Sequence, residues 1–265
     1  MNAKVTCADL LQMKKAGEKI TSLTAYDSSF ARILDEAGID IVLVGDSLGM
    51  VTQGMDTTLT VSMDDMVYHT KIVSPFCQRA MVVADLPFQS YESPAMAIVN
   101  AQRLRDEAGA ELVKLEGGVE MAETVQSLCD AGFEVCGHVG MQPQSIEKYG
   151  GFKVQGRDDE SAGSIMEGAL ALEQAGAAMI VLECIPAALA QRISEKLSIP
   201  TIGIGAGVNC DGQVLVIYDA LGVSDRSPRM AKNFLAESGN IRDAVARYIA
   251  AVKSGEFPAD EHSFT

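Results

Sequence analysis

Eight short apolar segments recur along the whole chain, and most of them show no alternation of apolar and polar residues. Unbroken apolar runs of this kind are typical of strands covered on both faces in a parallel sheet. We therefore expect the core to be built around such a sheet. The predicted strands are residues 19–26, 39–47, 80–87, 110–118, 133–140, 177–186, 199–207 and 212–222.

Stretches with helical character separate these strands. They cover residues 28–37, 63–79, 93–110, 120–131, 159–175 and 186–197. Ser93 followed by Pro94 has the form of an N-cap and a first helical residue. A Glu-Ala-Gly or Gln-Ala-Gly triplet precedes several strands, and a glycine at this place is typical of a helix end before a strand.

Eight strands that alternate with helices over about 250 residues have the size and order of a (β/α)8 TIM barrel. A doubly wound sheet is the competing fold, but it usually contains fewer strands. We expect a single barrel domain spanning residues 1–265, with a short N-terminal helix and a polar C-terminal tail that forms a surface strap or a subunit contact. Two long connections, 48–62 and 141–158, are expected on the C-terminal face.

Ionisable residues stand at the C-terminal ends of five predicted strands. In a parallel barrel these ends meet at one mouth, so the side chains are expected to gather there. Capping of the following helix is an alternative for a single Asp, but it does not explain carboxylates at four strand ends. The residues are Asp46 with Ser47, Asp85, Lys114 with Glu116, His138 and Glu183.

Three of these carboxylates would repel one another unless a cation lies among them. Asp and Glu oxygens without His or Cys partners suit a hard ion, above all Mg²⁺, which keeps several water or substrate ligands. We expect Asp46 and Asp85 to contact the metal and Glu116 to support it directly or through water. The sequence thus predicts a magnesium site at the mouth of the barrel.

Lys114 lies two residues before Glu116 on the same strand, so both side chains face the barrel interior. A lysine beside a metal is suited to hold a substrate carboxylate or a developing enolate. A structural ion pair with Glu116 or Asp85 is compatible with that role. Schiff-base formation by Lys114, as in a class I aldolase, is the rival mechanism.

Glu183 follows an apolar strand and precedes apolar residues, a setting suited to a proton-transfer group. The alternative is a glutamate at the helix start ahead of Pro186. His138 is either a further polar group of the mouth or a core histidine with satisfied hydrogen bonds. The glycines at 203, 205 and 207 do not have the dinucleotide-binding spacing, so close packing is the favoured explanation.

The formal net charge is −15, which makes binding to nucleic acid or to an anionic membrane improbable. The six cysteines include no C-x-x-C pair, which argues against a zinc ribbon or a dithiol motif. The first residues do not have the pattern of a signal peptide, and no apolar run has the length of a membrane span. A cytoplasmic enzyme is the expectation.

Ten ordered motifs carry a resemblance to a known family. They are "LTAYD", "VGDSLGM", "ADLPF", "VKLEGG", "CGHVGMQPQS", "GGFKVQGR", "VLECIP", "IGIGAG", "DGQVLV" and "KNFLAESG". Together they span almost the whole chain and closely resemble the ketopantoate hydroxymethyltransferases. The resemblance implies a barrel of the phosphoenolpyruvate/pyruvate type and a homodecamer.

The resemblance also implies the activity, which composition and spacing do not. The family transfers a one-carbon unit from 5,10-methylenetetrahydrofolate to 3-methyl-2-oxobutanoate through a metal-stabilised enolate, giving 2-dehydropantoate for coenzyme A synthesis. Matched by motif, the metal-binding acids are Asp46, Asp85 and Glu116 and the proton acceptor is Glu183. The substrate-binding residues are Asp46, Ser47, Asp85 and Lys114, with His138 as the active-site histidine.

Two other functions stay open on the residues alone. A metal-dependent lyase or aldolase of the same barrel type would cleave a C–C bond in an oxo acid without a one-carbon donor. A barrel without activity, used for binding or assembly, would have no reason to keep several mutually repelling acids at its mouth.

Overall fold

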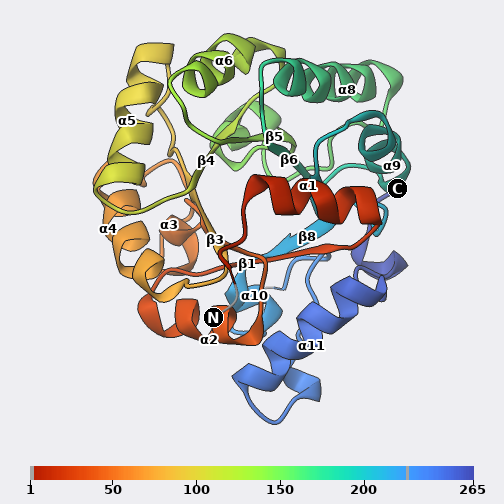
Figure 1. Cartoon of the computed structure of the whole chain (residues 1–265). Coiled ribbons are helices and arrows are strands. Elements are labelled where there is room, and N and C mark those ends of the chain that lie inside the picture. Colours follow the sequence, from red (N-terminus) through yellow and green to blue (C-terminus); the bar gives the residue numbers. More distant parts are fainter. Residues whose placement is uncertain (1–2, 225–226) are drawn as a thin grey trace.

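Eight parallel strands close into a barrel in the computed structural model, which describes residues 3–224 and 227–265 (Figure 1). Each strand pairs with the next, and β8 pairs with β1. The predicted TIM barrel is confirmed, and the open doubly wound sheet is excluded. The strands are β1 (Ile20–Thr24), β2 (Ile41–Val44), β3 (Met81–Asp85), β4 (Leu112–Glu116), β5 (Val135–Gly140), β6 (Met179–Glu183), β7 (Thr201–Ile204) and β8 (Gly212–Leu215).

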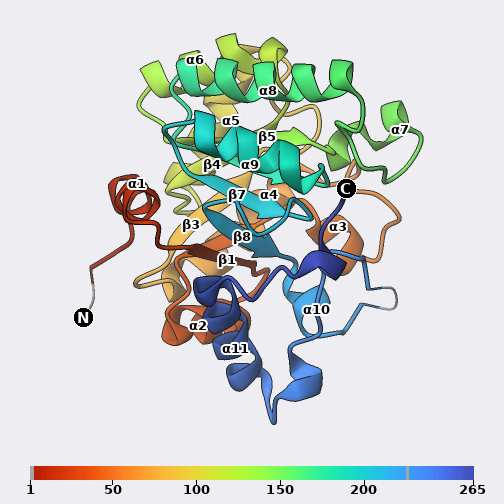
Figure 2. The ribbon, with the colours of Figure 1, turned by 90° about the vertical axis from the view of Figure 1, so that its right-hand side faces the viewer.

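Helices form a ring around the strands, and α1 lies at the opposite end of the barrel from α3 and α7 (Figures 1 and 2). The longer helices are α1 (Cys7–Ala16), α2 (Ser28–Ala37), α4 (Met63–Val73), α5 (Pro94–Asp106), α6 (Ala122–Asp130), α8 (Asp159–Gln174), α9 (Ala187–Lys196) and α11 (Ile241–Ser254). Single turns form α3 (Leu48–Val51), α7 (Ile146–Tyr149) and α10 (Ile217–Ala220). Short 3₁₀ segments are Ser74–Phe76, Val119–Met121, Pro143–Ser145, Leu235–Glu237 and Asp260–His262.

Local capping explains where the helices begin and end. Asp27 caps α2 by accepting hydrogen bonds from two backbone N–H groups, and Gly38 ends the helix at a φ of 85°. Ser93 caps α5 with Pro94 as its first residue, as predicted. These signals lie within a few residues of the boundary they set, so they are readable from the sequence.

The predicted strands are longer than the strands observed, most of all in the last one. The apolar segment 212–222 forms β8 only as far as Leu215 and then continues as the helical turn α10. The Ile217 N–H donates to Thr24 Oγ1 at 2.9 Å, and Ile217 and Ala220 remain buried. An apolar run is buried equally well by a strand or a helical turn, so the pattern alone did not locate the end of the strand.

Two apolar clusters hold the barrel together. One fills the interior of the barrel and includes Ile20, Met81, Leu112 and Met179. The other lies between the strands and the helices, because successive strand residues point alternately inward and outward. Among the described residues, no helix is long and apolar enough to cross a membrane.

The glycines after β7 permit close packing, as the sequence indicated. A Cβ on Gly207 would lie 2.6 Å from the Cβ of Ala187, and Gly207 has a φ of 82°. The C-terminal tail packs in the same region. The Ala187 N–H donates to the Phe264 carbonyl at 2.9 Å, while Phe257 and His262 are buried. The tail is thus a strap over the start of α9.

The predicted domain of residues 1–265 includes four positions, 1, 2, 225 and 226, that lie outside the described residues. The two long connections leave the C-terminal ends of β2 and β5, as expected. Each contains a single helical turn, α3 in the first and α7 in the second. Both connections therefore border the mouth at which the polar strand ends meet.

Candidate functional site

The strand register brings the predicted polar residues together at the C-terminal mouth. Asp85 of β3 lies beside Lys114 of β4, and Glu116 lies beside His138 of β5. On the far side of β5, Glu183 of β6 is paired with Gly140. The ionisable members of this set are all buried, from 2% exposed at Asp85 to 9% at Glu183.

Asp46 and Asp85 meet across the ends of β2 and β3. The Asp46 N–H donates to Asp85 Oδ2 at 3.1 Å, and Lys114 Nζ lies 2.7 Å from Asp85 Oδ1. Ser47, not Asp46, occupies the cap position of α3, and its side chain makes no capping hydrogen bond. The capping explanation for Asp46 is therefore wrong, and the ion pair suggested for Lys114 is present with Asp85.

His138 lies between two carboxylates. Its Nδ1 is 3.5 Å from Glu116 Oε1 and its Nε2 is 3.1 Å from Glu183 Oε2. Burial alone would lower the pKa of His138, but the contacts with Glu116 and Glu183 outweigh burial and raise it to about 9. His138 is thus part of the polar cluster, and the imidazolium is favoured at neutral pH.

The carboxylates outnumber the basic groups of the mouth. Burial raises the pKa of Asp46 well above its ordinary value, and the nearby Asp85 and Glu116 raise it further. Burial opposes the charge on Lys114, but Asp85, Glu116 and Asp46 outweigh it and raise the pKa of its amine. When all four acids are ionised, one ammonium and one imidazolium leave an excess of two negative charges.

The acids do not form a ready-made metal cage. Across residues 3–224 and 227–265, no three His, Cys, Asp or Glu side chains converge as a set of metal ligands. Although Lys114 Nζ is close to Asp85 Oδ1, no described donor has the direction of a hydrogen bond to that buried oxygen. Asp85 therefore presents an oxygen whose bonding capacity is incompletely used.

Two residues that the strand-end argument missed complete the cluster. Gln144 donates from Nε2 to Asp46 Oδ2 at 2.8 Å, and its backbone N–H donates to Glu116 Oε2 at 3.0 Å. The hydroxyl of Tyr91 donates to Gln144 Oε1. Both residues come from loops after strands, so no strand pattern marked them. The only available signal was the presence of polar residues in connections that border the mouth.

Ser47 is held by an aromatic hydroxyl. Its Oγ lies 2.8 Å from the Tyr26 hydroxyl, which is buried. Tyr26 lies two residues after the end of β1 and was also absent from the predicted site. This contact fixes the serine at the edge of the acid cluster, where its hydroxyl can still accept or donate a second hydrogen bond.

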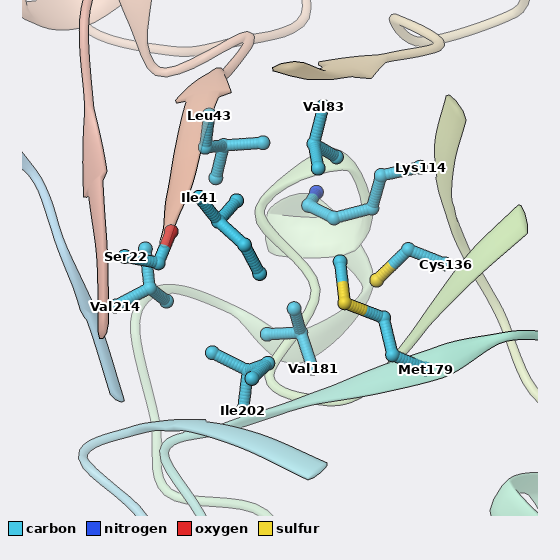
Figure 3. Close-up of a pocket in the computed structure, with 10 residues that line it drawn as sticks. All are labelled: Ser22, Ile41, Leu43, Val83, Lys114, Cys136, Met179, Val181, Ile202 and Val214. Atoms are coloured by element: carbon cyan, nitrogen blue, oxygen red, sulfur yellow. The ribbon is translucent and has the colours of Figure 1, made fainter. Parts of the chain in front are cut away.

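An apolar floor lies beneath the polar cluster. A cavity of about 10 Å³, close to the smallest volume that holds one water, is lined by Lys114 and mostly apolar side chains of the barrel interior (Figure 3). Burial raises the pKa of Cys136, which also lines it, to about 12, so its thiol stays neutral. This dry floor strengthens electrostatic interactions at the mouth.

The backbone turns sharply at Glu183. Cys184, the next residue, has a φ of 46°, a left-handed conformation that costs about 1–3 kcal/mol in a residue with a side chain. Gly140 makes room for this turn, because a Cβ there would lie 2.3 Å from the Glu183 carbonyl oxygen. Since α9 begins only at Ala187, Glu183 is not a helix-start residue, and the turn directs it to the mouth.

Comparisons with known proteins agree on one family. The family model described as ketopantoate hydroxymethyltransferase matches residues 4–260. The chain is 55% identical over 263 residues to a 3-methyl-2-oxobutanoate hydroxymethyltransferase of Syntrophus aciditrophicus, covering 98% of this chain and 97% of the relative. It is 54% identical over 264 residues to one of Methylococcus capsulatus, covering 100% and 98%.

Solved structures of lower sequence identity share the fold. A phosphonopyruvate hydrolase in complex with oxalate and Mg²⁺ is 12% identical with a TM-score of 0.64, over 83% of this chain and 84% of that one. A 2,3-dimethylmalate lyase described as a member of the PEP mutase/isocitrate lyase superfamily is 16% identical with a TM-score of 0.59, over 94% and 96%. With a family model that matches nearly the whole chain and full-length relatives above 50% identity, this protein belongs to the ketopantoate hydroxymethyltransferase family.

Proposed function

We propose that this protein transfers a hydroxymethyl group from 5,10-methylenetetrahydrofolate to 3-methyl-2-oxobutanoate and so forms 2-dehydropantoate for pantothenate and coenzyme A synthesis. Membership of the family and the names of its full-length relatives support the reaction. The single structural observation that carries the proposal is the gathering of four buried acids, Lys114 and His138 at one mouth.

A divalent metal ion fits this cluster. Asp46, Asp85 and Glu116 would hold Mg²⁺, with one or two of them as direct ligands and the rest of the shell left to water and substrate. Their oxygen donors suit a hard ion, and among the described residues no donor is aligned with the buried Asp85 Oδ1. When bound, Mg²⁺ would polarise the keto group of the substrate and make its C3 proton more acidic.

The residues of the chain supply the remaining chemistry. Glu183 accepts the C3 proton, so the C3–H bond breaks and its electron pair becomes the enolate. Lys114, Ser47 and the acids at Asp46 and Asp85 position the oxo acid. The enolate carbon then forms the new C–C bond to the one-carbon unit. Water supplies the hydroxyl group, both C–N bonds to the folate break, and the two folate nitrogens take up one proton from C3 and one from water to give tetrahydrofolate.

His138 supports this proton transfer. It lies 3.1 Å from Glu183 and contacts Glu116 through its other nitrogen. The imidazolium form therefore places a positive charge beside the base, although neither ring nitrogen has an aligned hydrogen-bond acceptor among the described residues.

Schiff-base catalysis by Lys114 is disfavoured on the same geometry. A nucleophilic lysine must be neutral, whereas the acids around Lys114 raise the pKa of its amine. Its 2.7 Å contact with Asp85 further favours the ammonium. The electrostatic role is therefore the better supported one.

The family resemblance supports a homodecamer that acts in the cytoplasm. Exposed apolar side chains on α4 and α5, among them Tyr68 and Val99, offer a surface for contacts between subunits. Sedimentation of the full chain measures the number of subunits directly, and a monomer at micromolar concentration would contradict the proposed assembly.

Deuterium exchange tests the proposed reaction. With Mg²⁺ and without folate, the protein should exchange the C3 proton of 3-methyl-2-oxobutanoate with D₂O, followed by NMR. Removal of Mg²⁺ should stop the exchange, and addition of 5,10-methylenetetrahydrofolate should convert the acid to the hydroxymethyl product. Absence of exchange in the presence of Mg²⁺ would refute the enolate step, and C–C cleavage without a donor would identify a lyase.

A further inference from the structure

Gln144 connects two acids that come from different strands. Its side chain binds Asp46 at the end of β2, and its backbone N–H binds Glu116 at the end of β4. The residue is 6% exposed and lies in the connection after β5. No other described residue forms hydrogen bonds to both of these acids.

The orientation of the Gln144 amide is fixed by its neighbours. Nε2 donates both to Asp46 and to the Leu86 carbonyl, the latter at 3.0 Å, so both amide hydrogens are used. The Tyr91 hydroxyl donates to Oε1 and so fixes the oxygen side of the amide. A flipped amide would lose all three hydrogen bonds and place its oxygen against a carboxylate.

Gln144 donates hydrogen bonds to two carboxylates that are proposed to hold the metal. Asp46 is buried, and the hydrogen bond from Gln144 to Asp46 Oδ2 fixes the direction in which its carboxylate points. The backbone N–H does the same for Glu116. Groups that orient ligands in this way typically change metal affinity about 10–100-fold when they are removed.

We propose that Gln144, oriented by Tyr91, is a positioning residue that holds Asp46 and Glu116 in place for a divalent cation. This inference rests on the proposed function, because it assigns to these acids the role of metal ligands. It also gives the connection after β5 a task at the site, in addition to covering the mouth.

Metal binding tests the role separately from turnover. Mn²⁺ affinity is measured on the full chain by electron paramagnetic resonance and by titration calorimetry with Mg²⁺. Gln144→Met, which keeps the length of the side chain and the backbone N–H, should weaken Mn²⁺ binding about tenfold. Tyr91→Phe leaves the amide free to turn and should weaken it about three- to tenfold.

A second Tyr–Gln pair in the same connection provides the matched control. The Tyr149 hydroxyl donates to Gln142 Oε1 at 3.2 Å, and no hydrogen bond joins this described pair to Asp46 or Glu116. Tyr149→Phe and Gln142→Met should leave the Mn²⁺ affinity unchanged. If Gln144→Met does not fold by circular dichroism, Tyr91→Phe decides the question.

Turnover gives a second readout. In Gln144→Met, the Mg²⁺ concentration for half-maximal rate should rise about tenfold, while kcat at saturating Mg²⁺ stays near that of the unchanged protein. Equal Mn²⁺ affinity in the unchanged protein, Gln144→Met and Tyr91→Phe would overturn the role of Gln144 alone. Failure of the unchanged protein to bind Mn²⁺ would instead overturn the metal-dependent function.

Discussion

Asp40 and Asp46 flank the same strand, β2, and are almost equally buried, at 1% and 3% exposed. Asp40 contacts Arg79 at 2.8 Å and Lys253 at 2.9 Å. The backbone N–H and the hydroxyl of Thr21 both donate hydrogen bonds to Asp40 Oδ2. Burial would raise the pKa of Asp40, but Arg79 and Lys253 outweigh it and lower the pKa. At the other end of the strand, the pKa of Asp46 is raised.

The difference lies in the supply of positive charge. At the N-terminal end of the strands, here called the lower end of the barrel, the buried carboxylate of Asp40 is paired with two cations, which stabilise the fold. The mouth gives four carboxylates only a lysine and a histidine, so part of their charge is left for a ligand. This contrast agrees with the general rule that residues at the C-terminal face of a TIM barrel serve chemistry and residues at the opposite face serve stability.

The largest expected effect is a loss of turnover on substitution of Glu183 at the mouth. Glu183→Gln removes the proposed proton acceptor but keeps the size of the side chain, so turnover should fall about 10²–10⁴-fold. Substrate binding by calorimetry should remain. Glu195→Gln, on an exposed part of α9, is the control and should keep full activity. Unchanged turnover in Glu183→Gln would contradict its role.

Addition of Mg²⁺ should raise the free energy of unfolding, and this gain should depend on Asp46 at the mouth but not on Asp40 at the lower end. A ligand that binds only the folded protein adds about 2.7 kcal/mol at a hundred times its Kd. The free energy of unfolding, measured in urea with Mg²⁺ or with EDTA, should show this gain in the unchanged protein and in Asp40→Asn. Asp46→Asn should lose most of it. An equal gain in all three proteins would argue against Asp46 as a ligand.

Removal of charge at the lower end should destabilise the protein. Asp40→Asn weakens the contacts with Arg79 and Lys253, whose side chains are partly exposed, so we expect a loss of about 2 kcal/mol in the free energy of unfolding. The pKa of Asp40 is lowered in the folded state, so on acidification the unfolded chain takes up the proton first.

The unchanged protein should therefore have its full excess in free energy of unfolding over Asp40→Asn above about pH 4, the pKa of an Asp in the unfolded chain. This excess should disappear as the pH falls further. Urea titrations of both proteins across this range measure the difference. A gap that stays constant from pH 7 to pH 3 would show that the ion pairs contribute nothing.

The smallest effect has the opposite sign. Asp46→Asn removes one charge from a crowded set of acids, so in EDTA the free energy of unfolding should rise by about 1 kcal/mol. The new side chain can still accept the hydrogen bond from Gln144, which keeps the packing comparable. A decrease in stability would mean that, without metal, nearby positive groups balance the charge of Asp46 as fully as Arg79 and Lys253 balance that of Asp40.

Most of the fold could be predicted from the sequence, because each signal is local. Apolar runs located all eight strands, and Ser93 with Pro94 marked the start of α5. The strand ends were predicted less well, most of all for β8, because the apolar pattern continues into α10. The gathering of the seven candidate residues could also be predicted, because parallel strands of a barrel necessarily bring their C-terminal ends to one mouth.

Loop contributions and partners were not predictable in the same way. Gln144 and Tyr91 approach Asp46 and Glu116 from connections whose path depends on the whole barrel. Strand direction separates Asp46 at the mouth from Asp40 at the opposite end, but the sequence does not identify Arg79 and Lys253 as the partners of Asp40.

By itself, the sequence determined which residues form strands and which chemical groups stand at the strand ends. Only the tertiary structure decided which charges face each other, and this set the direction of each pKa shift. The physical reason is that hydrophobic period and capping act within a few residues, whereas charge interactions depend on distances between segments far apart in the chain.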